Sequence, residues 1–416
     1  MGLPVGVRQL KMIETQDSKK KALLVIPIED INDSKLRIDE LSSLVKTMGL
    51  EVLSAIVFKI REFNSATMLG KGQLEELKDN ILYFECDCVI FDTSLSPRVL
   101  RNLENELDIC VIDREEVILQ IFADRAQTKE AKLQVALARS EYSLPRLRRR
   151  WEDLSQQRGG VRGSKGSGER QLELDKRSLS EKIVALKREL EEVKKIRKTQ
   201  RKSREKKDAY SFALVGYTNA GKSSLLNLLT NANTLVEDKL FATLDPTTRQ
   251  FKLKNRIDVT LTDTVGFVSN LPHHLISAFS STLEEAKYAD TLIIVIDLAN
   301  PDCERCQETT LEVLASLGAG DNDKIIVFNK IDNIANDIAY QRLKVSYPNH
   351  IEISVKERKN IDLLLDEMYK RVLETKKRST IYLPPEDGKA LSEIYRKYTV
   401  LSCTYENDKL KVEYLS

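Results

Sequence analysis

A phosphate-binding loop constrains this sequence more than any other feature. Residues 216–223 read Gly-Tyr-Thr-Asn-Ala-Gly-Lys-Ser: a glycine, four spacers and Gly-Lys-Ser. The apolar run 212–215 before it predicts a buried strand, and the run from Ser224 onward predicts a helix. In that setting successive backbone N–H groups and the helix N-terminus converge on phosphate groups. The predicted contacts are Gly216, Tyr217, Thr218, Asn219, Ala220, Gly221, Lys222, Ser223 and Ser224.

A second motif places a carboxylate beside this loop. Lys222 is expected to reach the β- and γ-phosphates and Ser223 to ligate Mg2+. The apolar run 257–262 predicts a strand that delivers Asp263 to the Mg2+ shell. The next residues, Thr264, Val265 and Gly266, complete the motif, and the N–H of Gly266 is expected to contact the γ-phosphate.

A third motif selects the base. The predicted strand 324–328 ends in Asn329, Lys330, Ile331 and Asp332, and this last carboxylate can accept two hydrogen bonds from guanine. Adenine offers no such pair of donors, so the site should reject it strongly. A loop over the base is predicted at Ser354, Val355 and Lys356, a small departure from the commoner Ser-Ala-Lys. The sequence therefore predicts GTP rather than ATP as the ligand.

Composition limits the class of protein. With 416 residues, 41% of them hydrophobic, the chain can form two to four structural units. It has no apolar run of about 18 residues and no signal-peptide pattern at its N-terminus, so we expect a cytosolic protein without a membrane span. The six cysteines show no disulfide framework, and Cys303 and Cys306 lack a second pair to complete a zinc site.

The predicted fold is α/β with several parts. Alternating strands and helices over residues 1–124 predict a parallel sheet. Residues 125–207 predict two long helices, the second from about Gln171 with apolar residues at heptad spacing, which should pair as an antiparallel hairpin. Residues 208–376 form the predicted G domain, and residues 377–416 a small α+β domain with a terminal strand hairpin.

The hairpin carries most of the positive charge. Residues 146–207 hold 22 Lys or Arg against 10 Asp or Glu, although the net charge of the whole chain is only +2. The predicted tip, residues 155–170, contains five glycines and four basic side chains. A flexible linker is one interpretation, but we favour contact with an RNA backbone. The candidate RNA-binding residues are Arg158, Arg162, Lys165 and Arg170.

The chain resembles the HflX family of GTPases from end to end. The resemblance rests on residues 216–223, on Lys-Leu-Phe-Ala-Thr-Leu-Asp-Pro-Thr-Thr-Arg at 239–249, on Leu-Thr-Asp-Thr-Val-Gly-Phe at 261–267, and on upstream strings at 94–97, 101–104, 111–114, 168, 171–173 and 175. It implies a monomeric GTPase that binds the large (50S) ribosomal subunit and its 23S rRNA and splits idle or stalled ribosomes under stress. The glycine-rich tip would reach toward the peptidyl-transferase centre.

Two alternatives remain open. The tip reads Gly-Ser-Lys-Gly-Ser-Gly-Glu-Arg at 163–170, where family members usually carry Gly-Thr-Arg-Gly-Pro-Gly-Glu. A divergent paralogue that protects ribosomes from antibiotics would fit this difference. A GTP-dependent switch that recruits a protein through the hairpin would need no RNA, and the salt dependence of binding would distinguish it.

The motifs also suggest how hydrolysis is controlled. In the segment Phe241, Ala242, Thr243, the threonine is the candidate that senses Mg2+ and the γ-phosphate, alongside Lys222 and Gly266 as catalytic groups. Phe267 stands where small G proteins carry a water-orienting glutamine, and its ring can only pack. We therefore expect slow intrinsic hydrolysis that a partner accelerates. Asn219 resembles the asparagine through which some GTPases bind K+.

Overall fold

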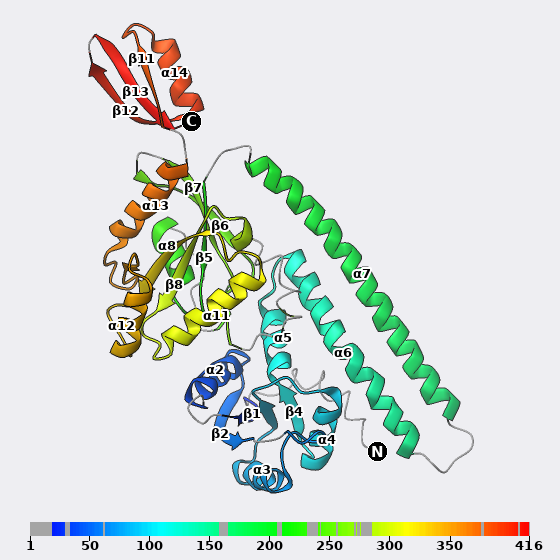
Figure 1. Cartoon of the computed structure of the whole chain (residues 1–416). Helices are drawn as coiled ribbons and strands as arrows, with labels where there is room; N and C mark the ends of the chain where they lie inside the picture. The colour runs from blue at the N-terminus through cyan, green and yellow to red at the C-terminus, as the bar shows by residue number, and fades with distance from the viewer. Residues whose placement is uncertain are drawn as a thin grey trace. The chain divides into compact units, whose positions relative to one another are not determined.

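The computed structural model of the chain combines helices with parallel sheets, which confirms the predicted fold class (Figure 1). It describes residues 19–29, 34–60, 63–157, 165–205, 210–230, 240–241, 243–254, 257–269, 272, 275, 285–375, 378–406 and 408–415. Two compact units can be distinguished, the first made mainly of residues 1–194 and the second mainly of residues 195–416. No helix within the described ranges is long and apolar enough to cross a membrane.

The first unit contains the predicted parallel sheet. Its strands follow the spatial order β2-β1-β3-β4, and every neighbouring pair is parallel. The strands are β1 (Lys21–Ile28), β2 (Glu51–Lys59), β3 (Cys88–Phe91) and β4 (Cys110–Asp113), and the helices are α2 (Ser34–Thr47), α3 (Lys71–Phe84), α4 (Pro97–Leu107) and α5 (Arg114–Arg125). Both β1 and β3 are buried almost throughout, as expected of central strands covered on both faces.

Buried ion pairs fill the carboxyl edge of this sheet, between β1 and β3. Arg114 is 2% exposed, contacts Asp92 after β3, and lies with Nη2 2.9 Å from Oε2 of Glu40. Arg37 donates from Nε to Asp92 Oδ2 at 2.6 Å and from Nη1 to the carbonyl of Pro27 at 2.8 Å. Open parallel sheets usually bind ligands where the strand order reverses. Here the side chains of the protein itself occupy that position.

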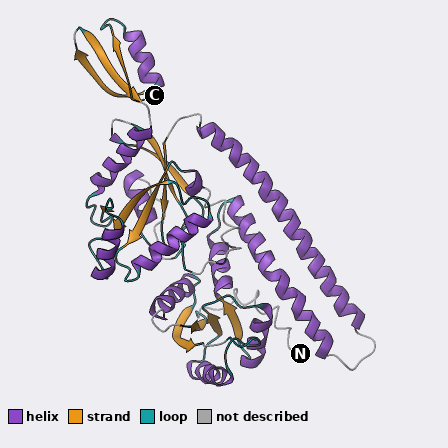
Figure 2. Ribbon diagram, viewed as in Figure 1, coloured by secondary structure: helices purple, strands orange, loops and turns teal. Residues whose placement is uncertain are grey.

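Helices α6 (Lys129–Gln157) and α7 (Lys165–Glu205) form the predicted antiparallel hairpin (Figure 2). Lys187 Nζ of α7 lies 2.8 Å from Glu141 Oε1 of α6. The apolar seam joins residues from both helices: Leu133, Leu137, Leu144, Ile183, Leu186 and Leu190. The heptad prediction is confirmed, because residues at that spacing line one face of a helix.

The start of α7 differs from the prediction. The helix begins at Lys165 rather than near Gln171, so Gly166 and Gly168 are helical. Each glycine costs roughly 1 kcal/mol in a helix, but a helix of 41 residues can accommodate two near its first turn. Residues 158–164, which include Arg158 and Arg162, lie outside the described residues.

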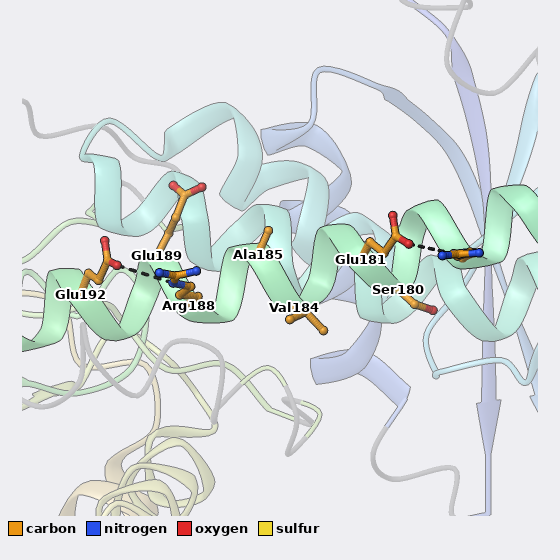
Figure 3. A pocket seen from close by; sticks show the side chains of 8 residues that line it. Ser180, Glu181, Val184, Ala185, Arg188, Glu189 and Glu192 are labelled. Atoms are coloured by element: carbon orange, nitrogen blue, oxygen red, sulfur yellow. Dashed lines mark hydrogen bonds and ion pairs between the residues drawn. The ribbon is translucent and has the colours of Figure 1, made fainter.

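The outer face of α7 carries a shallow pocket (Figure 3). Val184, 68% exposed, lies between two ion pairs of the helix surface. Arg177 pairs with Glu181, and Arg188 pairs with Glu192, both at four-residue spacing and with mostly exposed side chains. Such pairs contribute roughly 0.3–0.5 kcal/mol each to an exposed helix. The pocket is therefore typical of a solvated helix face.

The second unit is built on a six-stranded sheet that carries the predicted motifs at its strand ends. Its order is β10-β9-β8-β5-β7-β6, and only β6 is antiparallel to its neighbour. The strands are β5 (Tyr210–Val215), β6 (Thr247–Lys252), β7 (Asp258–Asp263), β8 (Thr291–Asp297), β9 (Asp323–Asn329) and β10 (Ile351–Glu352), and the described helices include α8 (Lys222–Thr230), α11 (Cys303–Ser316), α12 (Asp337–Ser346) and α13 (Ile361–Thr375).

The C-terminal residues form a three-stranded antiparallel sheet and one helix. The elements are β11 (Arg378–Leu383), α14 (Gly388–Lys397), β12 (Thr399–Glu406) and β13 (Lys409–Leu415), with β13 in the centre. The predicted hairpin of β12 and β13 is confirmed. Strand β11 was missed because Pro384 and Pro385 follow it and indicate a break, but Leu383 packs with Ile394 and Val412 in the core of this sheet.

The cysteine pair of α11 serves the core. Cys303 and Cys306 are 2% and 7% exposed, and Cys306 Sγ accepts a hydrogen bond from Asn300 Nδ2 at 3.4 Å. Burial raises the pKa of the Cys303 thiol to about 11. Within the described part of the chain, no cluster of three or more His, Cys, Asp or Glu side chains could hold a metal ion.

Candidate guanine nucleotide site

The phosphate loop connects β5 to α8 through three left-handed backbone conformations. They lie at Gly216 (φ 147°), Asn219 (φ 62°) and Gly221 (φ 93°). Gly216 has no room for a side chain, because a Cβ there would collide with the carbonyl oxygen of Val295 in β8. A loop with these alternating conformations turns successive N–H groups toward one centre, which is an anion site at a helix N-terminus.

Lys222 lies inside this loop. It is 6% exposed, and its Nζ donates to the carbonyls of Gly216 at 3.1 Å and Tyr217 at 2.7 Å. Burial lowers the pKa of the amino group to about 8, while the nearby Asp263 opposes the shift. Phosphate groups would supply further negative charge and favour the ammonium form. The lysine is therefore poised to gain a polyanion as its partner.

Two hydroxyls and one carboxylate meet beside the lysine. Ser223 Oγ and Thr243 Oγ1 are 2.8 Å apart and lie 2.6 Å and 2.9 Å from Asp263 Oδ2. Burial raises the pKa of Asp263, and Lys222, Ser223 and Thr243 oppose this. Its Oδ1 is buried without a hydrogen-bond partner among the described residues. Oxygen ligands of this kind suit Mg2+, the cation that GTPases generally use.

The segment after Asp263 is attached to the phosphate loop. Thr218 N donates to Phe267 O at 2.8 Å, and Phe267 N donates to Gly216 O at 3.1 Å. The Tyr217 hydroxyl accepts from Ser269 N at 2.8 Å and lies 2.9 Å from Ser269 Oγ. These contacts hold Gly266 over the loop and leave Phe267 only 1% exposed. The ring of Phe267 is packed and offers no hydrogen bond to water.

The base end of the site is organised around Asn329. This side chain, 2% exposed, donates from Nδ2 to Ala220 O at 2.9 Å and accepts from Val355 N at Oδ1 at 3.2 Å. It thereby joins the phosphate loop to the loop at 354–356. Ser354 is fully buried, and its Oγ accepts from Glu357 N at 3.1 Å. The two loops are thus held in place by protein contacts alone.

The lysine and aspartate of the base motif lie beside Asn329 in sequence and remain more accessible. Lys330 adopts φ 62° and donates from Nζ to Asp297 Oδ2 at 2.7 Å. Asp332 is exposed, and a hydrogen bond from Ser354 keeps the pKa of its carboxyl below the ordinary value, with help from Lys356 and Lys330. An ionised, open carboxylate can accept hydrogen bonds from a base.

Several predicted residues have other positions or lie outside the described residues. Phe241 belongs to the first compact unit, is 2% exposed, and its ring stands edge-on to Phe122 at 4.7 Å between centroids. Ala242 lies outside the described residues. Lys165 and Arg170 are in α7, and their side chains are likewise not described. The geometry therefore brings together the loop, Asp263 and base motifs, and it bears on neither Ala242 nor the basic tip.

Two contacts were missed at the level of sequence. Asp297, at the end of β8, pairs with Lys330, and Ser269 pairs with Tyr217. Asp297 had a recognisable signal, since it ends a buried strand next to the one that carries the base motif. Ser269 had none, because it lies 52 residues from Tyr217.

Three family models match consecutive parts of the chain. The model described as GTP-binding GTPase N-terminal matches residues 35–123, and GTP-binding GTPase Middle Region matches residues 125–204. The model described as 50S ribosome-binding GTPase matches residues 211–330, which hold the phosphate loop, Asp263 and the first two residues of the base motif.

Curated relatives match over most or nearly all of the chain. The GTPase HflX of Lacrimispora saccharolytica is 43% identical over 406 residues, covering 97% of this chain and 95% of the relative. GTPase HflX of Escherichia coli is 36% identical, covering 95% and 93%. GTPase HflX of Treponema denticola is 53% identical over 323 residues, covering 76% and 83%.

A solved structure supports the same assignment. The crystal structure of SsGBP in complex with GDP matches with a TM-score of 0.50 and 29% identity, and it covers 85% of this chain and 99% of that one. The match spans most of this chain, and that protein binds GDP.

Proposed function

Because this chain belongs to the HflX family of GTPases, we propose that it binds the large (50S) ribosomal subunit and splits idle or stalled ribosomes under stress. The chain is a GTPase, and it binds GTP and GDP. The observation that carries the ribosomal part is the match of residues 211–330 to 50S ribosome-binding GTPases. The basic surplus of residues 146–207 supports it, since rRNA is a polyanion.

In this proposal each motif has one task. The loop 216–224, through backbone N–H groups other than that of Thr218, holds the phosphates together with the Lys222 ammonium, and Asp332 selects guanine. Ser223, Thr243 and Asp263 would hold Mg2+, which neutralises charge on the β- and γ-phosphates. The Gly266 N–H would contact the γ-phosphate. The predicted RNA contacts at Arg158, Arg162, Lys165 and Arg170 would meet 23S rRNA.

In this proposal rapid hydrolysis needs a partner. Phe267 is buried and cannot orient water, so the free protein lacks the group that glutamine supplies in small G proteins. Ordered rRNA or protein groups of the large subunit would complete the site. The GTP state would then last until the subunit is engaged.

Purified large subunits should raise the GTP hydrolysis rate at least about tenfold, because one missing positioning group typically costs that much or more. Sucrose-gradient sedimentation with GTP or a non-hydrolysable analogue should show subunit peaks that grow at the expense of whole ribosomes.

The double variant Arg158→Glu, Arg162→Glu should reduce both the stimulation of hydrolysis and the splitting of ribosomes. Its binding should also lose part of the steep salt dependence that phosphate contacts produce.

A matched control carries the same charge change elsewhere. Arg342 of α12 and Lys370 of α13 are 68% and 62% exposed, and both sit in surface ion pairs. Arg342→Glu with Lys370→Glu should leave splitting unchanged. Equal rates with and without large subunits would remove the ribosomal proposal. An affinity for the large subunit that does not change with salt concentration would favour the protein-recruiting switch instead.

We also propose a K+ ion beside the phosphates, held through Asn219, which is exposed in the loop with φ 62°. Replacing Na+ by K+ should accelerate hydrolysis several-fold, roughly three- to tenfold, because the ion adds positive charge where negative charge develops. Asn219→Gly should abolish the difference, since glycine keeps the backbone conformation and removes only the amide. Equal wild-type rates in the two salts would exclude the ion.

A further inference from the structure

The hydroxyl of Thr218 is buried without a hydrogen-bond partner. The residue is 6% exposed, and its Oγ1 contacts no donor or acceptor among the described residues. Buried polar groups in native proteins are nearly always paired, and an exception calls for an explanation such as strain, a catalytic role or a bound water or ion. Thr218 is the second spacer of the phosphate loop, so a ligand of that loop is the obvious candidate.

The backbone of Thr218 cannot serve this ligand. Its N–H is committed to Phe267 O at 2.8 Å, and Phe267 N returns a bond to Gly216 O at 3.1 Å. Tyr217, the preceding residue, is fixed through its hydroxyl to Ser269. The loop is therefore fixed at Thr218 and at the two residues before it. Only the side-chain hydroxyl remains free to bind.

The side chain borders the position expected for the terminal phosphate. A Cβ built on Gly266 would lie 2.8 Å from Thr218 Cγ2 and 2.9 Å from Lys222 Nζ. These three residues therefore surround one point. Lys222 and Gly266 are the groups assigned to the γ-phosphate, and the side chain of Thr218, which carries the unpaired hydroxyl, lies beside Gly266 through its methyl group.

We propose that the Thr218 hydroxyl donates a hydrogen bond to a γ-phosphate oxygen of GTP. A hydroxyl is both donor and acceptor, and an anionic acceptor makes the bond stronger than a neutral one. GDP lacks this phosphate, so the contact distinguishes the two nucleotides. The inference rests on the proposed nucleotide site and assigns one further contact within it.

Thr218→Val tests the contact, because valine keeps the shape of threonine and removes the hydroxyl. We expect the affinity for a non-hydrolysable GTP analogue to fall about tenfold or more. The affinity for GDP should stay within about twofold of the wild type. The melting temperature of the nucleotide-free protein should not fall, since valine removes an unpaired buried hydroxyl. Thr218→Ser should retain analogue binding.

A loss of analogue affinity without a loss of GDP affinity or of thermal stability distinguishes this role from a structural one. Titration of the full chain with fluorescent GDP and analogue, without ribosomes, gives both affinities. Wild-type analogue binding by Thr218→Val overturns the proposal, and so does an equal loss for both nucleotides. Lys222→Ala serves as a reference and should strongly lower the affinity for both nucleotides. If neither affinity falls, the nucleotide site itself is misassigned and the proposed Thr218 contact is wrong as well.

Discussion

Replacing Asp332 by asparagine should lower the affinity for GTP and GDP about 100-fold, because the carboxylate accepts from two guanine donors and an amide presents one donor back to them. A fully enclosed site would lose more, but Asp332 is exposed in the free protein. Xanthine carries a carbonyl in place of the guanine amino group, so the variant should bind XDP better than the wild type does. Calorimetric titration with GDP and XDP measures both changes.

The control for this change is Asp337→Asn. Asp337 is an exposed aspartate in the first turn of α12, and the substitution alters charge and shape in the same way. It should leave both affinities unchanged. A GDP affinity within threefold of the wild type for Asp332→Asn would show that another group reads the base. Hydrolysis of the xanthine triphosphate XTP by the variant, at the rate at which the wild type hydrolyses GTP, would confirm that Asp332 acts on the base alone.

The motifs were predictable because each one is local. The phosphate loop follows β5, Asp263 ends β7 and Asn329 ends β9. The carboxyl ends of parallel strands meet at one edge of a sheet. Spacing along the sequence is then enough to bring Ser223 and Asp263 together. The heptad seam of α7 was visible for the same reason, since a helix places residues three and four apart on one face.

Contacts that depend on tertiary structure were not predictable. Tyr217 and Ser269 meet because a bridge joins residue 217 to residue 267, and no residue type signals that pairing. The buried ion pair of Arg114 with Glu40 joins α5 to α2, which belong to the first unit. It was not predictable because charged residues are normally assigned to the surface. Helix α7 begins earlier than predicted because a helix of 41 residues can accommodate the low helix propensity of two glycines near its start.

Gly216→Ala is the substitution expected to destabilise the second unit most. The residue adopts φ 147°, which side-chain-bearing residues rarely adopt, and a Cβ would collide with the backbone of Val295. That carbonyl belongs to the central strand β8, which pairs with β5 and β9, so it cannot move without breaking the sheet. We expect a loss of roughly 3 kcal/mol or more in the free energy of unfolding. GDP binding should be lost at temperatures where the wild type still binds.

Two other glycines separate the causes of this effect in scanning calorimetry. Gly49 has φ 84° and open space around it, so Gly49→Ala should cost only the backbone strain of roughly 1–2 kcal/mol. Gly72 lies in α3 with nothing within 4 Å, and Gly72→Ala should be neutral or stabilising by up to about 1 kcal/mol. The excess loss of Gly216→Ala over Gly49→Ala measures the collision with β8. Equal losses of stability for the two variants would mean that β8 can move to make room for the Cβ. Only the backbone strain would then destabilise Gly216→Ala.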